Sequence, residues 1–432
     1  MANSFRKSLK ASALIESVFK RFSRIQDPRN LEDPKITMAD HLMSGFAVFS
    51  LKFPSLLEYD RRAKDSVIKK NLKSLFHVQN PPSDTYLRER LDEINPALLR
   101  PVFKMIFSKL QRGKGLEPFH FMDGYYLISL DGTGEFFSNK VSCSDCCRKE
   151  HKNGKVSFYH QMLGACIVHP GQANVIPLCP EAIKHQDGHT KNDCERNASK
   201  RFIENLKREH PHLKAIIIED GLASNAPHLE LLQKHGMHYI IGAKPGDHKF
   251  LFDSVENSKS TVYHEFKDKK GHLHQFRFLN QVSLNKSNPD LKINFLEYRE
   301  TTSKGKSCDF SWVTDITITP ENVFQLMRGA RARWKIENET FNTLKNLGYN
   351  FGHNYGHGKQ YLATIFSMMM ALAFLIDQVQ LLCCNVFQTL KKRVGTYRGL
   401  WERMRVFFEY TFISSWEEFY QFINKEKMID TS

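Results

Sequence analysis

Two stretches of the chain share one pattern, in which a run of apolar residues ends at an aspartate followed by glycine. The first spans residues 125–134 and contains Asp131, and the second spans residues 213–221 and contains Asp220. β-branched and aromatic residues suit a covered strand and glycine favours a turn, so each run predicts a buried strand that ends at its aspartate. Because ligands gather at the carboxyl ends of strands in open α/β sheets, we expect the two aspartates to converge around Mg²⁺ or Mn²⁺. The alternative is that each aspartate only caps its own turn.

The segments around these runs predict a mixed α/β core. Apolar strands at residues 156–168 and 175–178 are separated by a short connection of the kind that joins hairpin strands. A helix follows at about residues 192–209, and after the strand that ends at Asp220 come a second helix and a strand at residues 239–241. This order favours a layered fold with helices on both faces of a central sheet.

The remaining chain divides by its hydrophobic period. Residues 248–319 alternate apolar with polar positions, which predicts an antiparallel β insertion between core parts at residues 119–247 and 320–382. Residues 1–118 show helical spacing with many lysines, typical either of a DNA-binding bundle or of a structural helical domain with a basic surface. Residues 383–432 combine a basic segment with aromatic residues at helical spacing, which predicts a helical region whose aromatic residues form either a helix core or a surface for dimerisation.

Composition narrows the class of partner. The 432 residues include 62 Lys and Arg against 47 Asp and Glu, a net charge of +15, which suits a polyanion such as DNA better than a membrane surface. Charges within the first ten residues argue against a signal peptide, and nine unevenly spaced cysteines favour a reducing, cytoplasmic compartment. The longest apolar run, residues 361–376, is short for a membrane span and predicts a buried helix.

A group of thiols after the first aspartate raises the question of zinc. Cys143 and Cys146 form a Cys-x-x-Cys pair, and His151 follows closely. This spacing permits a structural zinc site, although free thiols in a loop are the alternative. One further residue would complete four ligands, and the candidates for it are His160, Cys179 or His185.

A third acid lies on a predicted helix over residues 331–345. On a regular α-helix Glu337 would share a face with apolar residues, whereas Glu339 would point away. Those apolar residues are Trp334, Phe341 and Leu344. An acid in an apolar stripe needs neutralisation, either by a metal ion or by an ion pair with Arg333 one turn earlier.

Taken together, Asp131-Gly-Thr, Asp220-Gly and the Arg333-to-Glu337 segment resemble the catalytic regions of DDE-type insertion-sequence transposases of the cut-and-paste, IS-four-like branch. The resemblance spans residues 123–375 and implies an RNase H-like core with a β insertion before the last acid. In its helix the family's pattern has Tyr three residues before the Arg and Lys seven residues after the Glu. Here Ala330 and Leu344 occupy those places.

The resemblance implies a magnesium- or manganese-dependent enzyme of DNA transposition that cleaves and joins strands at the ends of its element. Asp131, Asp220 and Glu337 would hold two divalent ions, which activate the attacking oxygen and stabilise the leaving one. The DNA-contacting candidates on the same helix are Arg331, Arg333, Trp334 and Lys345. The partners of such an enzyme would be double-stranded DNA, namely terminal inverted repeats and target DNA. A homodimer would bind them on the prokaryotic nucleoid.

Three other functions are consistent with these residues. An RNase H-like nuclease without strand transfer needs the same acids, and an inactive derivative would retain only DNA binding. A zinc-dependent DNA reader built around Cys143 and Cys146 is a further alternative.

Overall fold

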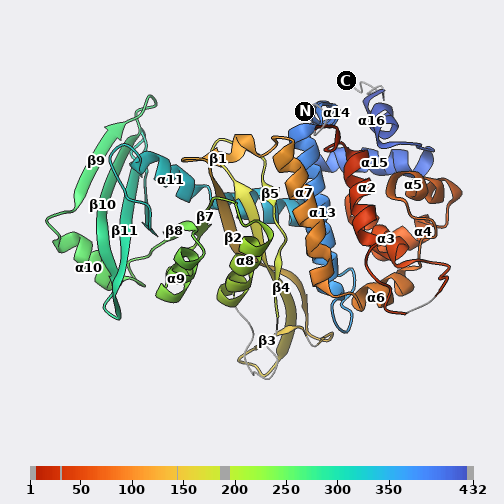
Figure 1. Cartoon of the computed structure of the whole chain (residues 1–432), viewed down its shortest axis with the longest axis horizontal. Helices are drawn as coiled ribbons and strands as arrows, with labels where there is room; N and C mark the ends of the chain where they lie inside the picture. The colour runs from red at the N-terminus through yellow and green to blue at the C-terminus, as the bar shows by residue number, and fades with distance from the viewer. Residues whose placement is uncertain (1–5, 30–31, 144, 185–194, 426–432) are drawn as a thin grey trace.

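The computed structural model describes residues 6–29, 32–143, 145–184 and 195–425. A twelve-stranded sheet runs through the molecule, with helices packed at one end and a β-rich region at the other (Figure 1). The fold is therefore mixed α/β with helical N- and C-terminal regions, as the sequence predicts.

The centre of the sheet has the strand order of an RNase H-like core. Strand β2 (Tyr125–Ser138) pairs antiparallel with β4 (Val156–Val168) and parallel with β7 (Ala215–Glu219). Strand β8 (His238–Gly242) continues the parallel side, and the short β6 (Glu181–Ile183) pairs with the outer edge of β4. The order of these strands across the sheet is thus third, second, first, fourth and fifth, which confirms the predicted core.

Two helices cross between the parallel strands and lie in front of the sheet in Figure 1. They are α8 (Glu195–Glu209) and α9 (Ala226–Lys234), which flank β7 in the sequence. All five residues of β7 are buried, as expected for a parallel strand covered on both faces. The predicted start of α8 at about residue 192 lies outside the described residues.

The predicted β insertion is present and extends the core sheet. Strand β12 (Ser307–Thr314) pairs antiparallel with β8 of the core. The outer strands follow as the antiparallel series β11 (Asn288–Thr301), β10 (Leu273–Asn285) and β9 (Val262–Lys267), beside helix α10 (Lys249–Asn257). The insertion forms the left end of the molecule in Figure 1.

The N- and C-terminal helices pack together in one bundle. The N-terminal helices are α2 (Ala11–Phe22), α3 (Met38–Ser50), α4 (Leu56–Arg62), α5 (Ser66–Phe76), α6 (Asp84–Asp92) and α7 (Arg100–Arg112). The C-terminal helices are α13 (Leu362–Cys383), α14 (Asn385–Val394), α15 (Tyr397–Tyr410) and α16 (Trp416–Lys425). The Asn71 amide donates to the carbonyl oxygens of Phe408 and Thr411, and the Trp416 indole donates to that of Leu75.

Helix α13 forms the centre of this bundle. It is long and apolar enough to cross a membrane, yet 94% of that apolar window is buried inside the fold, as expected for a core helix. Within the bundle, the buried Lys52 ammonium contacts the Asp377 carboxylate and lies 3.8 Å from the centroid of the Trp401 ring. The Tyr349 hydroxyl also donates to Asp377, so a charged group on α13 is fully engaged by its neighbours.

Candidate active site

Asp131 lies within strand β2 and not at its end, which corrects the sequence prediction. The parallel pairing with β7 ends at Ser129 opposite Ile218, whereas the pairing with β4 continues through Asp131 opposite Gly164 as far as Ser138. The glycines that follow Asp131 are accommodated in this antiparallel ladder and make no turn. Asp131 therefore lies where β2 extends beyond the end of its parallel neighbour.

Asp220 follows directly after β7 and caps a short 3₁₀ turn. Its Oδ1 accepts the backbone N–H of Leu222 at 2.9 Å, and Oδ1 of Asp131 likewise accepts the N–H of Gly132 at 2.9 Å. The capping alternative is thus realised at Asp220, whereas the bond made by Asp131 lies within strand β2. Each local bond occupies one carboxylate oxygen, and an ionised carboxylate has four acceptor positions, so capping and metal binding are compatible.

The two aspartates meet in a small pocket, which we call the acidic pocket. Its volume is about 30 Å³, and its acidic lining residues are Asp131, Glu195, Glu219 and Asp220. Glu195 is the first residue of α8, and its side chain lies against Gly132. A Cβ added at Gly132 would lie 2.2 Å from Oε1 of Glu195. The sequence does not single out Glu195, because one acid in the first turn of a predicted helix carries no signal of its own.

The acids of this pocket influence one another electrostatically. Burial raises the pKa of Asp131 to about 6; the Arg333 guanidinium opposes this rise, and the charges of Glu337 and Glu195 add to it. Burial also raises the pKa of Glu195, with further contributions from Asp220 and Glu219. Negative charge is therefore concentrated here beyond what neighbouring cations neutralise.

Glu219 differs from the other acids because the protein itself satisfies its carboxylate. It lies 2.5 Å from Nε2 of His228 and accepts a hydrogen bond of 3.0 Å from the Ser199 hydroxyl. Burial lowers the pKa of His228, but the charge and hydrogen bond of Glu219 outweigh burial and raise it. This buried pair fastens the end of β7 to α8 and α9, and thereby fixes the position of Asp220.

The late helical segment is interrupted, so the prediction of one regular α-helix is wrong. Helix α11 (Val323–Arg331) ends before a turn, and residues Ile336–Phe341 form a π-helical segment, η4, that leads into α12 (Asn342–Asn346). A π-turn adds a residue and rotates the side chains before it relative to those after it. Such segments are frequent at functional sites.

This rotation separates the residues that the sequence places on one face. Trp334 is 44% exposed and Glu337 is exposed, whereas Phe341 and Leu344 are buried. Phe341 packs directly over Gly164 of β4, where an added Cβ would meet its ring at 2.6 Å. Packing of the second half of the segment against the sheet thus leaves Glu337 free of the apolar stripe.

Arg333 connects the third acid to the first. Its Nη1 lies 3.4 Å from Oδ2 of Asp131, and its Nη2 lies 2.6 Å from Oε1 of Glu337. The Ser129 hydroxyl donates to the Arg333 carbonyl oxygen at 3.2 Å, which holds this turn against β2. The structure therefore brings Glu337 to the side of Asp131, with the predicted Arg333 ion pair between them.

The other DNA-contacting candidates have different surroundings. Arg331 pairs with Glu300 at 2.7 Å and stacks over Phe310, so it faces the β insertion. Lys345 is exposed, and Trp334 presents its ring to solvent. Trp312 is 7% exposed and belongs to the core.

The Cys-x-x-Cys pair lies in a second cluster away from the acids. Cys143, Cys146, His160 and His357 place their ligand atoms within 4.8 Å of one another, and we call them the Cys-His cluster. His151 is not a member of this cluster, and its Nε2 bonds to the Ser157 hydroxyl instead. Of the other candidate ligands, Cys179 is buried and bonds to the Pro180 carbonyl oxygen, and His185 lies outside the described residues.

Comparison with known proteins finds likeness to solved structures. No family model and no curated relative matches the chain. Among solved structures, a piggyBac transposase synaptic complex with hairpin DNA is similar with a TM-score of 0.43 and 10% identity, over 99% of this chain and 83% of that one.

Proposed function

We propose that the protein is a metal-dependent DNA strand transferase of the DDE transposase type. The observation that carries the proposal is the acidic pocket, where Asp131 and Asp220 from adjacent parallel strands of an RNase H-like core line one space. Arg333 reaches Asp131 from the late helical segment of the core and pairs on its other side with Glu337. The shared pocket of Asp131 and Asp220, together with the Arg333 link from Asp131 to Glu337, supports the assignment of these three acids.

The donor set fits divalent ions of the Mg²⁺ or Mn²⁺ type. Carboxylate oxygens are their preferred ligands. Burial, with a smaller contribution from Glu337 and Glu195, raises the pKa of Asp131, and a bound cation would favour its ionised form. When bound, such ions supply Lewis acidity to a phosphoryl oxygen and an activated hydroxyl for in-line displacement. Asp131, Asp220 and Glu337 would hold them, and Glu195 borders the same space as a fourth carboxylate.

The surroundings of the pocket offer groups for DNA. Arg333 would exchange a carboxylate for a scissile phosphate, since a guanidinium binds either in a planar, bidentate way. Trp334 is exposed beside this arginine and suits base stacking, and Lys345 and Arg196 are exposed cations on neighbouring elements. The net charge of +15 favours long-range attraction to double-stranded DNA, which a homodimer would bind at two ends.

A cleavage assay tests the proposal. Labelled duplexes from the genomic sequence on either side of the coding region would be incubated with the protein and Mg²⁺, Mn²⁺ or EDTA. We expect metal-dependent cleavage at a defined boundary and joining of the released end to a second duplex. Asp131→Asn, Asp220→Asn and Glu337→Gln should each lose cleavage while retaining DNA binding, and the control Glu339→Gln should retain both.

The outcomes separate the alternatives. Cleavage without joining would indicate an RNase H-like nuclease, and binding without cleavage would indicate an inactive derivative. Full activity of Glu337→Gln combined with loss in Glu195→Gln would transfer the role of third acid to Glu195. Cleavage that persists in Asp131→Asn would refute the proposed site.

A further inference from the structure

The Cys-His cluster has the dimensions of a tetrahedral metal site. The Sγ atoms of Cys143 and Cys146 are 3.9 Å apart, and they lie 3.3 and 3.5 Å from Nε2 of His160. Nε2 of His357 lies 3.1 Å from Sγ of Cys146. With Zn–S bonds of about 2.3 Å and Zn–N bonds of about 2.0 Å, tetrahedral geometry requires about 3.8 Å between sulfurs and about 3.5 Å between sulfur and nitrogen.

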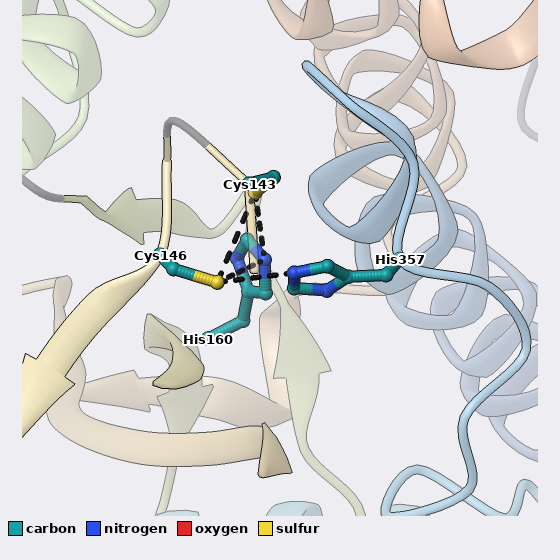
Figure 2. A group of neighbouring side chains, drawn as sticks. All are labelled: Cys143, Cys146, His160 and His357. Atoms are coloured by element: carbon teal, nitrogen blue, oxygen red, sulfur yellow. Dashed lines mark hydrogen bonds between the residues drawn. The ribbon is translucent and has the colours of Figure 1, made fainter. Parts of the chain in front are cut away.

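The four side chains converge from distant parts of the chain. Cys143 and Cys146 lie between β2 and β3 (Cys147–Glu150), His160 is on β4, and His357 comes from the loop before α13 (Figure 2). Cys146 and His357 are 211 residues apart in sequence. No local helical or strand repeat brings these residues together. A ligand that all four share is the simplest cause of their convergence.

The loop that carries His357 is shaped for this approach. Gly356 and Gly358 on either side of His357 have φ values of +145° and +69°, a region that side chains with a Cβ rarely adopt. The four residues after Gly358 are held by Asp92 of the N-terminal helices. Its carboxylate accepts the backbone N–H groups of Lys359, Gln360, Tyr361 and Leu362. The path of the loop thus presents the imidazole to the cluster.

The local chemistry also suits a metal. Cys146, His160 and His357 are buried, and the buried Glu135 carboxylate lies close enough to His160 to influence its charge. A metal ligand imidazole offers a ring nitrogen to the ion, and Nε2 of both His160 and His357 lies against the thiols. Two thiolates and two neutral imidazoles form a donor set typical of structural zinc.

We propose that Cys143, Cys146, His160 and His357 bind one structural Zn²⁺. The ion fastens the hairpin of β2 and β4 to the loop between α12 and α13. Since β2 carries Asp131 and α12 continues the segment of Glu337, the zinc supports the relative placement of the two parts of the acidic pocket. The zinc site itself does not depend on the proposed catalytic function.

Metal analysis of the full-length protein tests this proposal. Protein purified without chelator should contain one zinc per chain by mass spectrometry of the metal. After removal of zinc, one equivalent of Co²⁺ should give the visible absorption of a tetrahedral site and a near-ultraviolet sulfur-to-cobalt band. Removal of the metal should lower the melting temperature and open the loop around residue 357 to proteases.

Variants identify the ligands. Cys146→Ser and His357→Ala should bind Co²⁺ at least about tenfold more weakly, whereas His151→Ala and Cys308→Ser should bind it like the unaltered protein. His357→Cys should keep the metal and strengthen the sulfur-to-cobalt band, which separates loss of a ligand from failure to fold.

The proposal is overturned by any of three results. They are an unaltered protein that takes up no stoichiometric zinc or cobalt, undiminished binding in His357→Ala, or a Cys143–Cys146 disulfide in protein prepared under reducing conditions. DNA cleavage is not a readout in these measurements, so they stand or fall separately from the proposed function.

Discussion

Replacing Asp131 with Asn should make the metal-free protein more stable at neutral pH. The fold raises the pKa of Asp131 from 3.8 to about 6, chiefly by burial. At pH 7.5 this corresponds to about 3 kcal/mol of lost stability, since a tenfold change in acid strength is worth about 1.4 kcal/mol. Asn keeps the shape of the protonated acid and removes the charge, so Asp131→Asn should recover about 1–3 kcal/mol.

The sign of this effect fixes its pH dependence. Below pH 3.8 Asp131 is protonated in both folded and unfolded chains and costs nothing. As the pH rises towards 6, the unfolded chain loses its proton first, so unfolding becomes progressively easier. The gain from Asp131→Asn should therefore be full at pH 7.5 and about half as large at pH 5.

Urea unfolding followed by tryptophan fluorescence, with EDTA present, measures this difference. Mg²⁺ added in excess of the EDTA should then raise the free energy of unfolding of the unaltered protein. The rise should be about 2.7 kcal/mol when free Mg²⁺ is 100 times its dissociation constant, and Asp131→Asn should show no rise. An Asp131→Asn protein that is less stable than the unaltered one at pH 7.5 would refute this reasoning. It would mean that the ion pair with Arg333 outweighs burial and repulsion.

Three further outcomes are expected. Glu195→Gln removes a negative charge that raises the pKa of Asp131, so the acid limb of the pH–cleavage profile should move to lower pH; an unmoved limb would contradict the coupling. Asp377→Ala leaves the buried ammonium of Lys52 unpaired and should cost about 3–5 kcal/mol in urea unfolding, and a cost below about 1 kcal/mol would show that water solvates this lysine. Trp334→Ala should weaken DNA binding by about 1–3 kcal/mol in fluorescence anisotropy without a change in melting temperature, whereas a large melting change would assign Trp334 to the core.

Local patterns in the sequence predict much of the fold. The apolar runs before Asp131 and Asp220 are strands of one sheet, and the predicted β insertion at residues 248–319 is antiparallel over residues 262–314, although it begins with helix α10 and not with a strand. The apolar run at residues 361–376 lies in a buried helix. Each of these predictions depends on a run or period of apolar residues that by itself indicates the local secondary structure.

The features that the sequence does not predict depend on contacts between distant segments. Asp131 lies inside a strand because β4 continues to pair beyond the end of β7, which no property of residues 125–134 reveals. Glu337 leaves the apolar face because packing of Phe341 on Gly164 accompanies a π-turn. His357 replaces the nearby His151 in the Cys-His cluster for a similar reason, since the loop that carries it is positioned by the helical bundle.

A crystal structure of the protein soaked with Mn²⁺, with anomalous diffraction to locate the metal, tests the proposed metal site most directly. We expect Mn²⁺ between the carboxylates of Asp131 and Asp220, with Arg333 displaced and Glu337 or Glu195 as a further ligand. Mn²⁺ absent from the acidic pocket at saturating concentration, with Arg333 still bridging Asp131 and Glu337, would contradict it.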